Sequence, residues 1–148
     1  MSSYDLFTVD TQAFFINLKP NPIQRMLDFD YVSGREKRSV AAVIHPGRSG
    51  FHKAFFGEKE ILIPIYPTIQ EAVDSHPQVD SVINFASFRS AYESSINAIL
   101  QSTIKTITIV AEGVPERQMK ELVALSKKHG TTIIGPATVG AIVGGTFR

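Results

Sequence analysis

The sequence has no cysteine, almost no net charge and no long apolar run. Without cysteine the protein has no disulfide, no thiolate nucleophile and no cysteine-based zinc or iron–sulfur site. A net charge of +1 creates no field that would attract nucleic acid or an anionic membrane. No apolar run approaches the roughly 20 residues that cross a bilayer, and the N-terminus lacks the regions of a signal peptide. We therefore expect a cytoplasmic protein.

The remaining composition is that of one globular domain. The chain has 148 residues, of which 43% are hydrophobic and 20% are charged, enough to bury a core. Short apolar runs alternate with amphipathic stretches. Strands are predicted at 12–16, 40–44, 61–66, 79–85, 104–110 and 131–134, and helices at 22–31, 68–75, 88–101 and 115–129. This succession predicts an α/β fold with a doubly wound parallel sheet.

Two charged or aperiodic segments are expected to lie outside the packed structure. Residues 1–10 show no periodicity and are predicted to form a loose end, so we divide the chain into an extension, 1–11, and a domain, 12–148. The charged run 35–38 is predicted to be a solvated connection.

Several local patterns predict how individual elements begin and pack. Pro64 favours an edge strand or a short one, because proline cannot donate to a sheet. Thr68 and Glu71 have the spacing of a capping box. The predicted buried faces are Ile23, Met26, Leu27 and Tyr31 in the first helix, Phe88, Tyr92, Ile96 and Ile99 in the third, and Met119, Leu122, Val123 and Ser126 in the fourth.

Glycine, small polar residues and one acid gather where the predicted strands end. In an open parallel sheet, ligands bind beyond the carboxyl ends of the strands. The segments at this edge are 17–22, 45–52, 84–89, 111–115 and 135–140. Their shared location predicts the ligand site.

The first of these loops lacks the glycines of a dinucleotide-binding loop, which argues against a nicotinamide cofactor. Lys19 is either an exposed turn residue or a phosphate contact. In the second loop, Gly47 and Gly50 allow a close backbone approach and Arg48 could bind a phosphate through two hydrogen bonds. A flexible surface loop explains the second pattern equally well.

The later loops are ambiguous in the same way. Ser87 has the position of a helix N-cap, with Arg89 in the first turn, where a cation opposes the helix dipole. Glu112 precedes Gly113 and Pro115, and Pro115 is predicted to open a helix. An acid there is either a favourable helix-terminal charge or a functional group.

The four histidines show no arrangement that predicts chemistry. His45, His52, His76 and His129 lack metal-ligand spacing on one helix face, and His76 and His129 are predicted to be surface residues. No nucleophile-elbow motif accompanies them. We expect neither a metal site nor a Ser–His–Asp triad.

Five motifs resemble one known family. They are Met26–Val32, Glu60–Pro64, Ile83–Tyr92, Ala111–Glu116 and Ile133–Gly140. Together, over about residues 12–148, they resemble the CoA-binding domain of the ATP-citrate lyase (ATP-citrate synthase) family, which is related to the succinyl-CoA synthetase α subunit. The resemblance implies a Rossmann-like fold. It also implies a parent enzyme that makes acetyl-CoA, oxaloacetate, ADP and phosphate from citrate, CoA and ATP through phosphohistidine, citryl-phosphate and citryl-CoA.

The resemblance also implies site residues, with coenzyme A as the bound substrate. Asn17, Leu18, Lys19 and Pro20 would meet the nucleotide end of CoA, and Arg48 matches the position of a CoA-contacting lysine. The pantetheine arm would be flanked by Ala86, Ser87 and Phe88, and its thiol end by Val110 and Ala111. Glu112 resembles the acid that faces the phosphohistidine loop and is the predicted catalytic residue.

The sequence departs from the family in its first loop, where Asn17–Pro22 replaces a glycine-rich phosphate loop. The phosphohistidine, ATP-grasp, citrate-binding and citryl-CoA lyase modules are absent, so ATP and Mg²⁺ would bind on other domains or subunits. We therefore expect a fragment that is inactive alone. The alternatives are a citryl-CoA or succinyl-CoA synthetase as parent, or a stand-alone CoA- or nucleotide-binding module.

Overall fold

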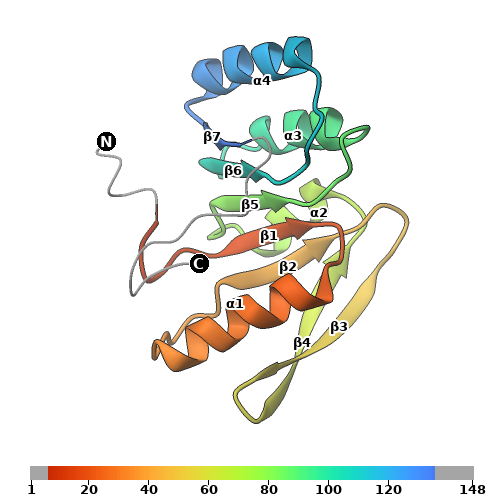
Figure 1. Ribbon diagram of the computed structural model, residues 1–148. Coiled ribbons are helices and arrows are strands. Elements are labelled where there is room, and N and C mark those ends of the chain that lie inside the picture. Colours follow the sequence, from red (N-terminus) through yellow and green to blue (C-terminus); the bar gives the residue numbers. More distant parts are fainter. Residues whose placement is uncertain (1–6, 136–148) are drawn as a thin grey trace.

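The protein is represented by a computed structural model that describes residues 7–135. Its seven strands form one sheet with the order β3-β4-β2-β1-β5-β6-β7 (Figure 1). The elements are β1 (Ala13–Ile16), α1 (Pro20–Val32), β2 (Val40–Ile44), β3 (Gly50–Phe56), β4 (Lys59–Tyr66), α2 (Ile69–Ser75), β5 (Ser81–Asn84), α3 (Ala91–Ile99), β6 (Thr106–Ile109), α4 (Glu116–His129) and β7 (Thr132–Ile134). All neighbouring strands are parallel except β3 and β4.

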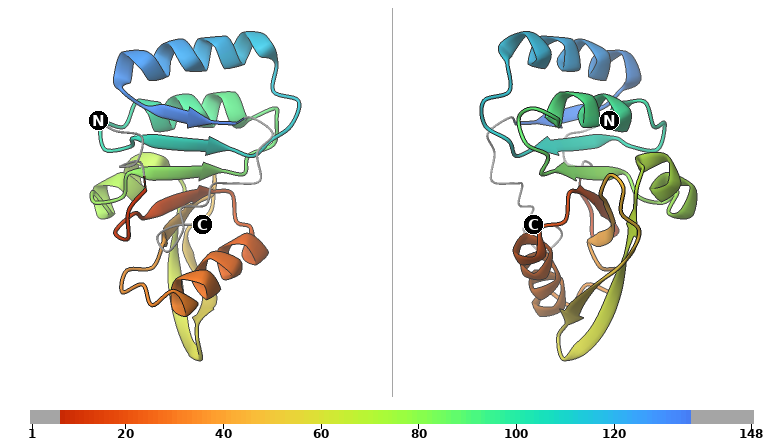
Figure 2. Two further views of the ribbon diagram at one scale, coloured as in Figure 1. Left: turned by 60° about the vertical axis from the view of Figure 1, so that its left-hand side comes forward. Right: turned by 90° about the vertical axis from the view of Figure 1, so that its right-hand side faces the viewer.

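Helices pack on both faces of the sheet (Figure 2). Phe14 and Phe15 are neighbours in β1 but belong to two different hydrophobic cores, because successive side chains of a strand point to opposite faces. On one face, α1 contributes Ile23, Met26 and Leu27. On the other, α2, α3 and α4 contribute Ala72, Ile99 and Leu122. The predicted α/β class, Rossmann-like and doubly wound, is confirmed.

Two helix ends are capped by specific residues, and the capping box at Thr68 is the one that the sequence predicts. The Thr68 hydroxyl oxygen accepts the backbone N–H of Glu71 at 3.3 Å and its hydrogen is donated to the Glu71 carboxylate at 3.2 Å. Gly130 ends α4 with a φ of 70°, a left-handed conformation that glycine adopts without steric cost. His129 lies in the last turn of α4, where a cation favours the helix dipole.

β3 is a strand that the sequence pattern did not predict. It pairs with β4 in an antiparallel hairpin whose register joins Phe51 to Pro64. The expectation that Pro64 lies in an edge strand or a short one is wrong, because β4 has eight residues and lies between β3 and β2. Proline is tolerated there because β2 pairs with β4 only from Ile65 onward, so Pro64 has no partner on that side.

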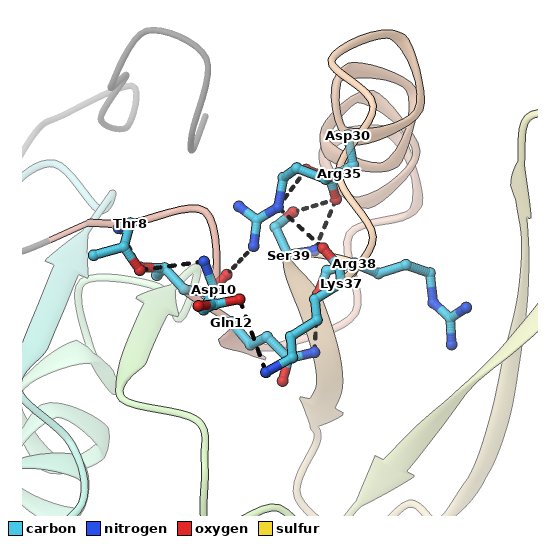
Figure 3. Close-up of polar contacts among 9 residues, drawn as sticks. Thr8, Asp10, Gln12, Asp30, Arg35, Lys37, Arg38 and Ser39 are labelled. Carbon is cyan, nitrogen blue, oxygen red and sulfur yellow. Dashed lines mark hydrogen bonds and ion pairs between the residues drawn. The ribbon is translucent and has the colours of Figure 1, made fainter.

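The charged run 35–38 is not simply a solvated connection, because Arg35 is buried. Figure 3 shows its polar contacts. Its Nη2 donates to the Thr11 carbonyl at 2.6 Å, and its Nε lies 3.8 Å from the Asp30 carboxylate. Asp30 in turn accepts the backbone N–H and the hydroxyl of Ser39, both at 2.7 Å. We refer to Asp30, Arg35 and Ser39 as the Asp30 cluster. It ties the end of α1 to the starts of β1 and β2.

Burial shifts the pKa values of the two charged groups in this cluster. Desolvation raises the pKa of Asp30, against the lowering effect of its bonds to Ser39 and of the Arg35 charge. Desolvation also lowers the pKa of Arg35. Nearby, Phe7 is buried in the same core as α1. The prediction of a loose end is therefore wrong at Phe7, and the division of the chain at residue 11 stays a prediction.

Several predicted positions in the helices and in the turns before them are wrong. α3 begins at Ala91, with Ser90 rather than Ser87 as its N-cap, so Arg89 precedes the helix. Pro115 is the N-cap of α4 and not its first helical residue. Three residues of the predicted buried faces are exposed: Phe88, Tyr31 and Val123. Phe88 is exposed because it lies in the turn before α3, where helical periodicity does not apply.

His76 is half-buried, contrary to the prediction of a surface residue. Its ring packs edge-on against Phe14 and Tyr66, and its Nε2 lies 3.0 Å from the Tyr66 hydroxyl. Burial lowers the pKa of His76, because the charged imidazolium loses hydration. In the part of the chain that the structure describes, no helix has the length and apolarity to cross a bilayer.

Candidate functional site

Backbone hydrogen bonds join the loops that follow the strands. The N–H of Asn17 donates to the Ile44 carbonyl at 2.8 Å, and that of Phe85 donates to the Ile16 carbonyl at 3.1 Å. The N–H of Val110 donates to the Asn84 carbonyl at 3.1 Å. Because these bonds continue the pairing of the sheet, the loops form one row along its carboxyl edge.

The loop after β1 is held in a left-handed turn. Asn17 has a φ of 73°, a conformation that asparagine adopts more readily than most residues, and its side-chain amide donates to the Phe85 carbonyl at 3.4 Å. Leu18 packs against the core, whereas Lys19 is exposed. Pro20 and Pro22 have no N–H, and the N–H of Ile23 is bonded to Lys19. The start of α1 therefore offers a phosphate little more than one backbone donor and the Lys19 ammonium.

The loop after β2 presents an arginine to solvent. Gly47 adopts a φ of 73°, and the N–H of Arg48 closes the turn on the His45 carbonyl at 3.1 Å. Arg48 is exposed, and its guanidinium has no hydrogen bond or ion pair with any residue that the structure describes. Its charge is close enough to His52 to lower the pKa of that imidazole, although burial contributes more. Arg48 is thus available to an anionic ligand.

The loop after β5 changes from buried to exposed within two residues. Ala86 is 4% exposed, and its N–H is bonded to the Asn84 side chain at 2.9 Å. Ser87 is exposed, and Phe88 is 45% exposed, with the Arg89 guanidinium 5.4 Å from its ring centroid. An exposed apolar ring beside a cation can pack against an uncharged chain and contact an anionic group.

The loop after β6 carries the predicted acid. Val110 and Ala111 are half-buried, and Glu112 is exposed beside Gly113, whose φ is 79°. The acid in the first turn of α4 is Glu116, so Glu112 is not a helix-terminal charge in the usual sense. Within the described residues, no cation or hydrogen-bond donor pairs with its carboxylate. The explanation of Glu112 as a favourable helix-terminal charge is thereby weakened.

A cavity of about 340 Å³ lies at the same edge. Its walls include Ile16 and Ile44, Pro46, the first residues of α2, and one side of α3. None of the predicted site residues lines it, although Asn17 directly follows the lining residue Ile16 and Arg48 lies two residues beyond Pro46. The α3 wall consists of Ser94, Asn97, Leu100 and Gln101. Sequence reasoning missed these residues, because Ser94, Asn97 and Gln101 recur at helical spacing outside the predicted buried face, where polar side chains ordinarily indicate a solvated surface.

Comparison with known proteins gives a family. A model of the CoA binding domain matches residues 38–113, just over half of the chain. The chain belongs to the CoA-binding domain family. This domain is 53% identical over all 148 residues to ATP-citrate synthase beta chain protein 1 of Oryza sativa subsp. japonica, and it spans 24% of that relative. It is 45% identical over 148 residues to ATP-citrate synthase of Bos taurus, of which it spans 14%. The predicted family resemblance is confirmed.

Solved structures extend this likeness. An ATP citrate lyase from Methanothrix soehngenii, in complex with citrate and coenzyme A, is 48% identical with a TM-score of 0.96, over 99% of this chain and 24% of that one. A dinucleotide-forming acetyl-coenzyme A synthetase from Ca. Korarchaeum cryptofilum is 17% identical with a TM-score of 0.59, over 87% of this chain and 27% of that one. The second likeness shows a shared fold only.

Proposed function

We propose that this chain is the CoA-binding domain of an ATP-citrate synthase. The observation that carries the proposal is its likeness to the Methanothrix soehngenii enzyme, whose structure contains citrate and coenzyme A, at 48% identity and a TM-score of 0.96. At that similarity the backbone of the carboxyl edge is expected to be the same in both proteins.

The order of the loops supports an extended ligand along this edge. Because β2, β1, β5 and β6 are successive neighbours, the loops that follow them stand in a row about 14 Å long. The loops that carry Arg48 and Lys19 are at one end, the loop of Ala86, Ser87 and Phe88 is in the middle, and that of Val110 and Ala111 is at the other end. CoA is anionic at its nucleotide end and uncharged along its pantetheine arm. We propose that it lies with its phosphates at the cationic end and its thiol near Ala111.

For the phosphates, the proposal relies on side chains rather than on backbone donors. Asn17, Leu18, Lys19 and Pro20 would contact the nucleotide end mainly through the Lys19 ammonium and the ordered turn, since prolines remove donors from the start of α1. Arg48 can form two parallel hydrogen bonds to one phosphate. This arrangement differs from a glycine-rich phosphate loop.

We further propose that Glu112 orients a phosphohistidine loop from another module of the enzyme. Its exposure and its position beyond β6, at the proposed thiol end, support this role. The proposal assigns ATP and Mg²⁺ to an ATP-grasp module of the longer enzyme, as the family resemblance implies.

The activity of the whole enzyme belongs to the same proposal. It would convert citrate, CoA and ATP into acetyl-CoA, oxaloacetate, ADP and phosphate, with phosphohistidine, ATP-grasp and citryl-CoA lyase modules as partners. The chain spans 24% of its plant relatives, which supports a longer parent protein. The cytoplasmic location expected from the sequence is also proposed, and cell fractionation of the parent enzyme tests it.

Isothermal titration of CoA into the chain tests the binding function. We expect weak binding, because a site shared between domains lacks some of its walls. Arg48→Ala and Ser87→Ala should each weaken it. Arg38→Ala is a matched control, because Arg38 and Arg48 flank opposite ends of the same strand, β2, and both are exposed. Absence of heat at millimolar CoA would contradict the proposal, as would equal losses from Arg38→Ala and Arg48→Ala.

A further inference from the structure

Asn84, the last residue of β5, is completely buried. A primary amide in such a position costs free energy unless its oxygen and nitrogen are both hydrogen-bonded. Both are. The side-chain oxygen accepts the Ala86 N–H at 2.9 Å, and the nitrogen donates to the Ser94 hydroxyl at 2.9 Å and to the Ser95 hydroxyl at 3.0 Å. A leucine or valine would fill the space without making any of these bonds.

These bonds join three parts of the carboxyl edge. Ala86 begins the loop between β5 and α3, and Ser94 lies in the wall of the 340 Å³ cavity. The backbone carbonyl of Asn84 accepts the N–H of Val110, in the loop after β6. One buried residue therefore contacts two of the loops in the proposed CoA site and the helical wall of the neighbouring cavity.

The bond to Ala86 controls the direction in which the chain leaves the sheet. An asparagine side chain that accepts the N–H two residues ahead forms a turn without help from the rest of the protein. Ala86 is buried, and Ser87 and Phe88 project from it into solvent. The Asn84 oxygen thus fixes the point from which both exposed side chains begin.

The bond to Ser94 controls a hydroxyl in the cavity wall. Ser94 donates its proton to the Ser90 carbonyl at 2.8 Å, so its oxygen is free to accept from Asn84. With one donor and one acceptor bond fixed, the hydroxyl cannot rotate freely. Ser94 is half-buried, which leaves part of its surface open to the cavity.

We propose that Asn84 is a positioning residue for CoA, which it does not touch, acting through the Ala86 backbone and the Ser94 hydroxyl. This inference rests on the proposed CoA-binding function. A buried polar residue is ordinarily explained by fold stability alone. The inference gives the Asn84 amide a role in ligand binding as well.

The test compares CoA affinity with stability in three variants of the chain. Asn84→Ala removes the hydrogen bonds to both Ala86 and Ser94. Asn84→Ser keeps a side-chain oxygen that can still accept the Ala86 N–H. Leu27→Ala is the control, because Leu27 is equally buried but belongs to α1, which packs on the opposite face of the sheet. Each variant is titrated with CoA at a temperature where circular dichroism shows that it is folded.

We expect Asn84→Ala to raise the CoA Kd about tenfold, the effect of losing hydrogen bonds that hold a site in place. Asn84→Ser should fall between Asn84→Ala and the wild type, and Leu27→Ala should bind like the wild type although it unfolds more easily. Wild-type affinity in folded Asn84→Ala or Asn84→Ser would overturn the inference, as would an equal loss in Leu27→Ala. Failure of the wild type itself to bind CoA would instead refute the proposed function.

Discussion

The two edges of the sheet use the same kinds of charged residue in opposite ways. At the amino edge, Arg35 and Asp30 face each other with side chains that are each 1% exposed, and Ser39 supplies two further hydrogen bonds to the carboxylate. At the carboxyl edge, Arg48 and Glu112 are exposed and have no partner among the described residues. At the amino edge the charged side chains pair with each other, and at the carboxyl edge they are exposed to solvent.

The difference shows that residue type does not decide what a charge does. A buried charge must be paired, and the loss of one partner leaves the other desolvated. An exposed charge contributes little to stability and is free to bind a ligand. We therefore expect substitutions at the amino edge to change the free energy of unfolding, and substitutions at the carboxyl edge to change binding and turnover.

The largest effect on stability is expected from Arg35→Ala. This change leaves Asp30 buried without its cation and removes a bond to the Thr11 carbonyl, so it should lower the free energy of unfolding by about 3–5 kcal/mol. Urea denaturation followed by circular dichroism measures the loss. Arg38→Ala, three residues away and exposed, is the control, with an expected change within about 0.5 kcal/mol. Similar losses of unfolding free energy in Arg35→Ala and Arg38→Ala would contradict the distinction between paired, buried charges and unpaired, exposed ones.

The next effect concerns catalysis and leaves stability unchanged. Glu112→Gln should keep the unfolding free energy within about 0.5 kcal/mol of the wild type and leave CoA binding intact. In the full enzyme it should reduce turnover about 100-fold, because a misplaced reacting loop costs that order of rate. Glu116→Gln, in the first turn of α4, is the control and should retain turnover. Normal turnover in Glu112→Gln would refute the role of Glu112.

The smallest effect is a pH dependence of stability from His76. Its folded-state pKa is lowered by burial, so between that pKa and its unfolded value of about 6.5 the unfolded state binds more protons. The contribution of neutral His76 to the free energy of unfolding is therefore fully present above about pH 6.5. It is lost as the pH falls through this window. His76→Gln should flatten the slope of urea midpoints between pH 5 and 8. His52 contributes equally to the slope in the wild type and in His76→Gln. An unchanged slope would therefore contradict the role of His76.

The sequence predicted the strands and helices well where hydrophobic periodicity was strong. Val40–Ile44 has the predicted bounds, and Thr68 caps α2 as its spacing indicates. β3 escaped prediction because Phe51 and Phe55 are apolar on a face that the structure leaves exposed, which obscures the alternation of a half-buried strand. The burial of Arg35 depends on the Thr11 carbonyl, 24 residues away, and no local pattern contains that information.

The candidate site could be located from the sequence more easily than it could be described. Strand ends are visible in a sequence, and the rule for parallel sheets places Asn17, Arg48 and Glu112 on one edge. The cavity wall formed by Ser94 and Asn97 was not predicted, because it depends on how α3 packs against the sheet. Residue 84 lies in the predicted segment 84–89, but the role proposed for Asn84 was not predicted, since it comes from hydrogen bonds that form only in the folded chain.

The central claim is that CoA binds along the carboxyl edge and that the amino edge serves stability. Hydrogen–deuterium exchange with and without saturating CoA tests it on the unmodified chain. We predict slower exchange in the loops 17–19, 45–49, 85–90 and 110–113, and no change in 35–39. Protection confined to 35–39, or no protection at any loop under saturating CoA, would contradict the account.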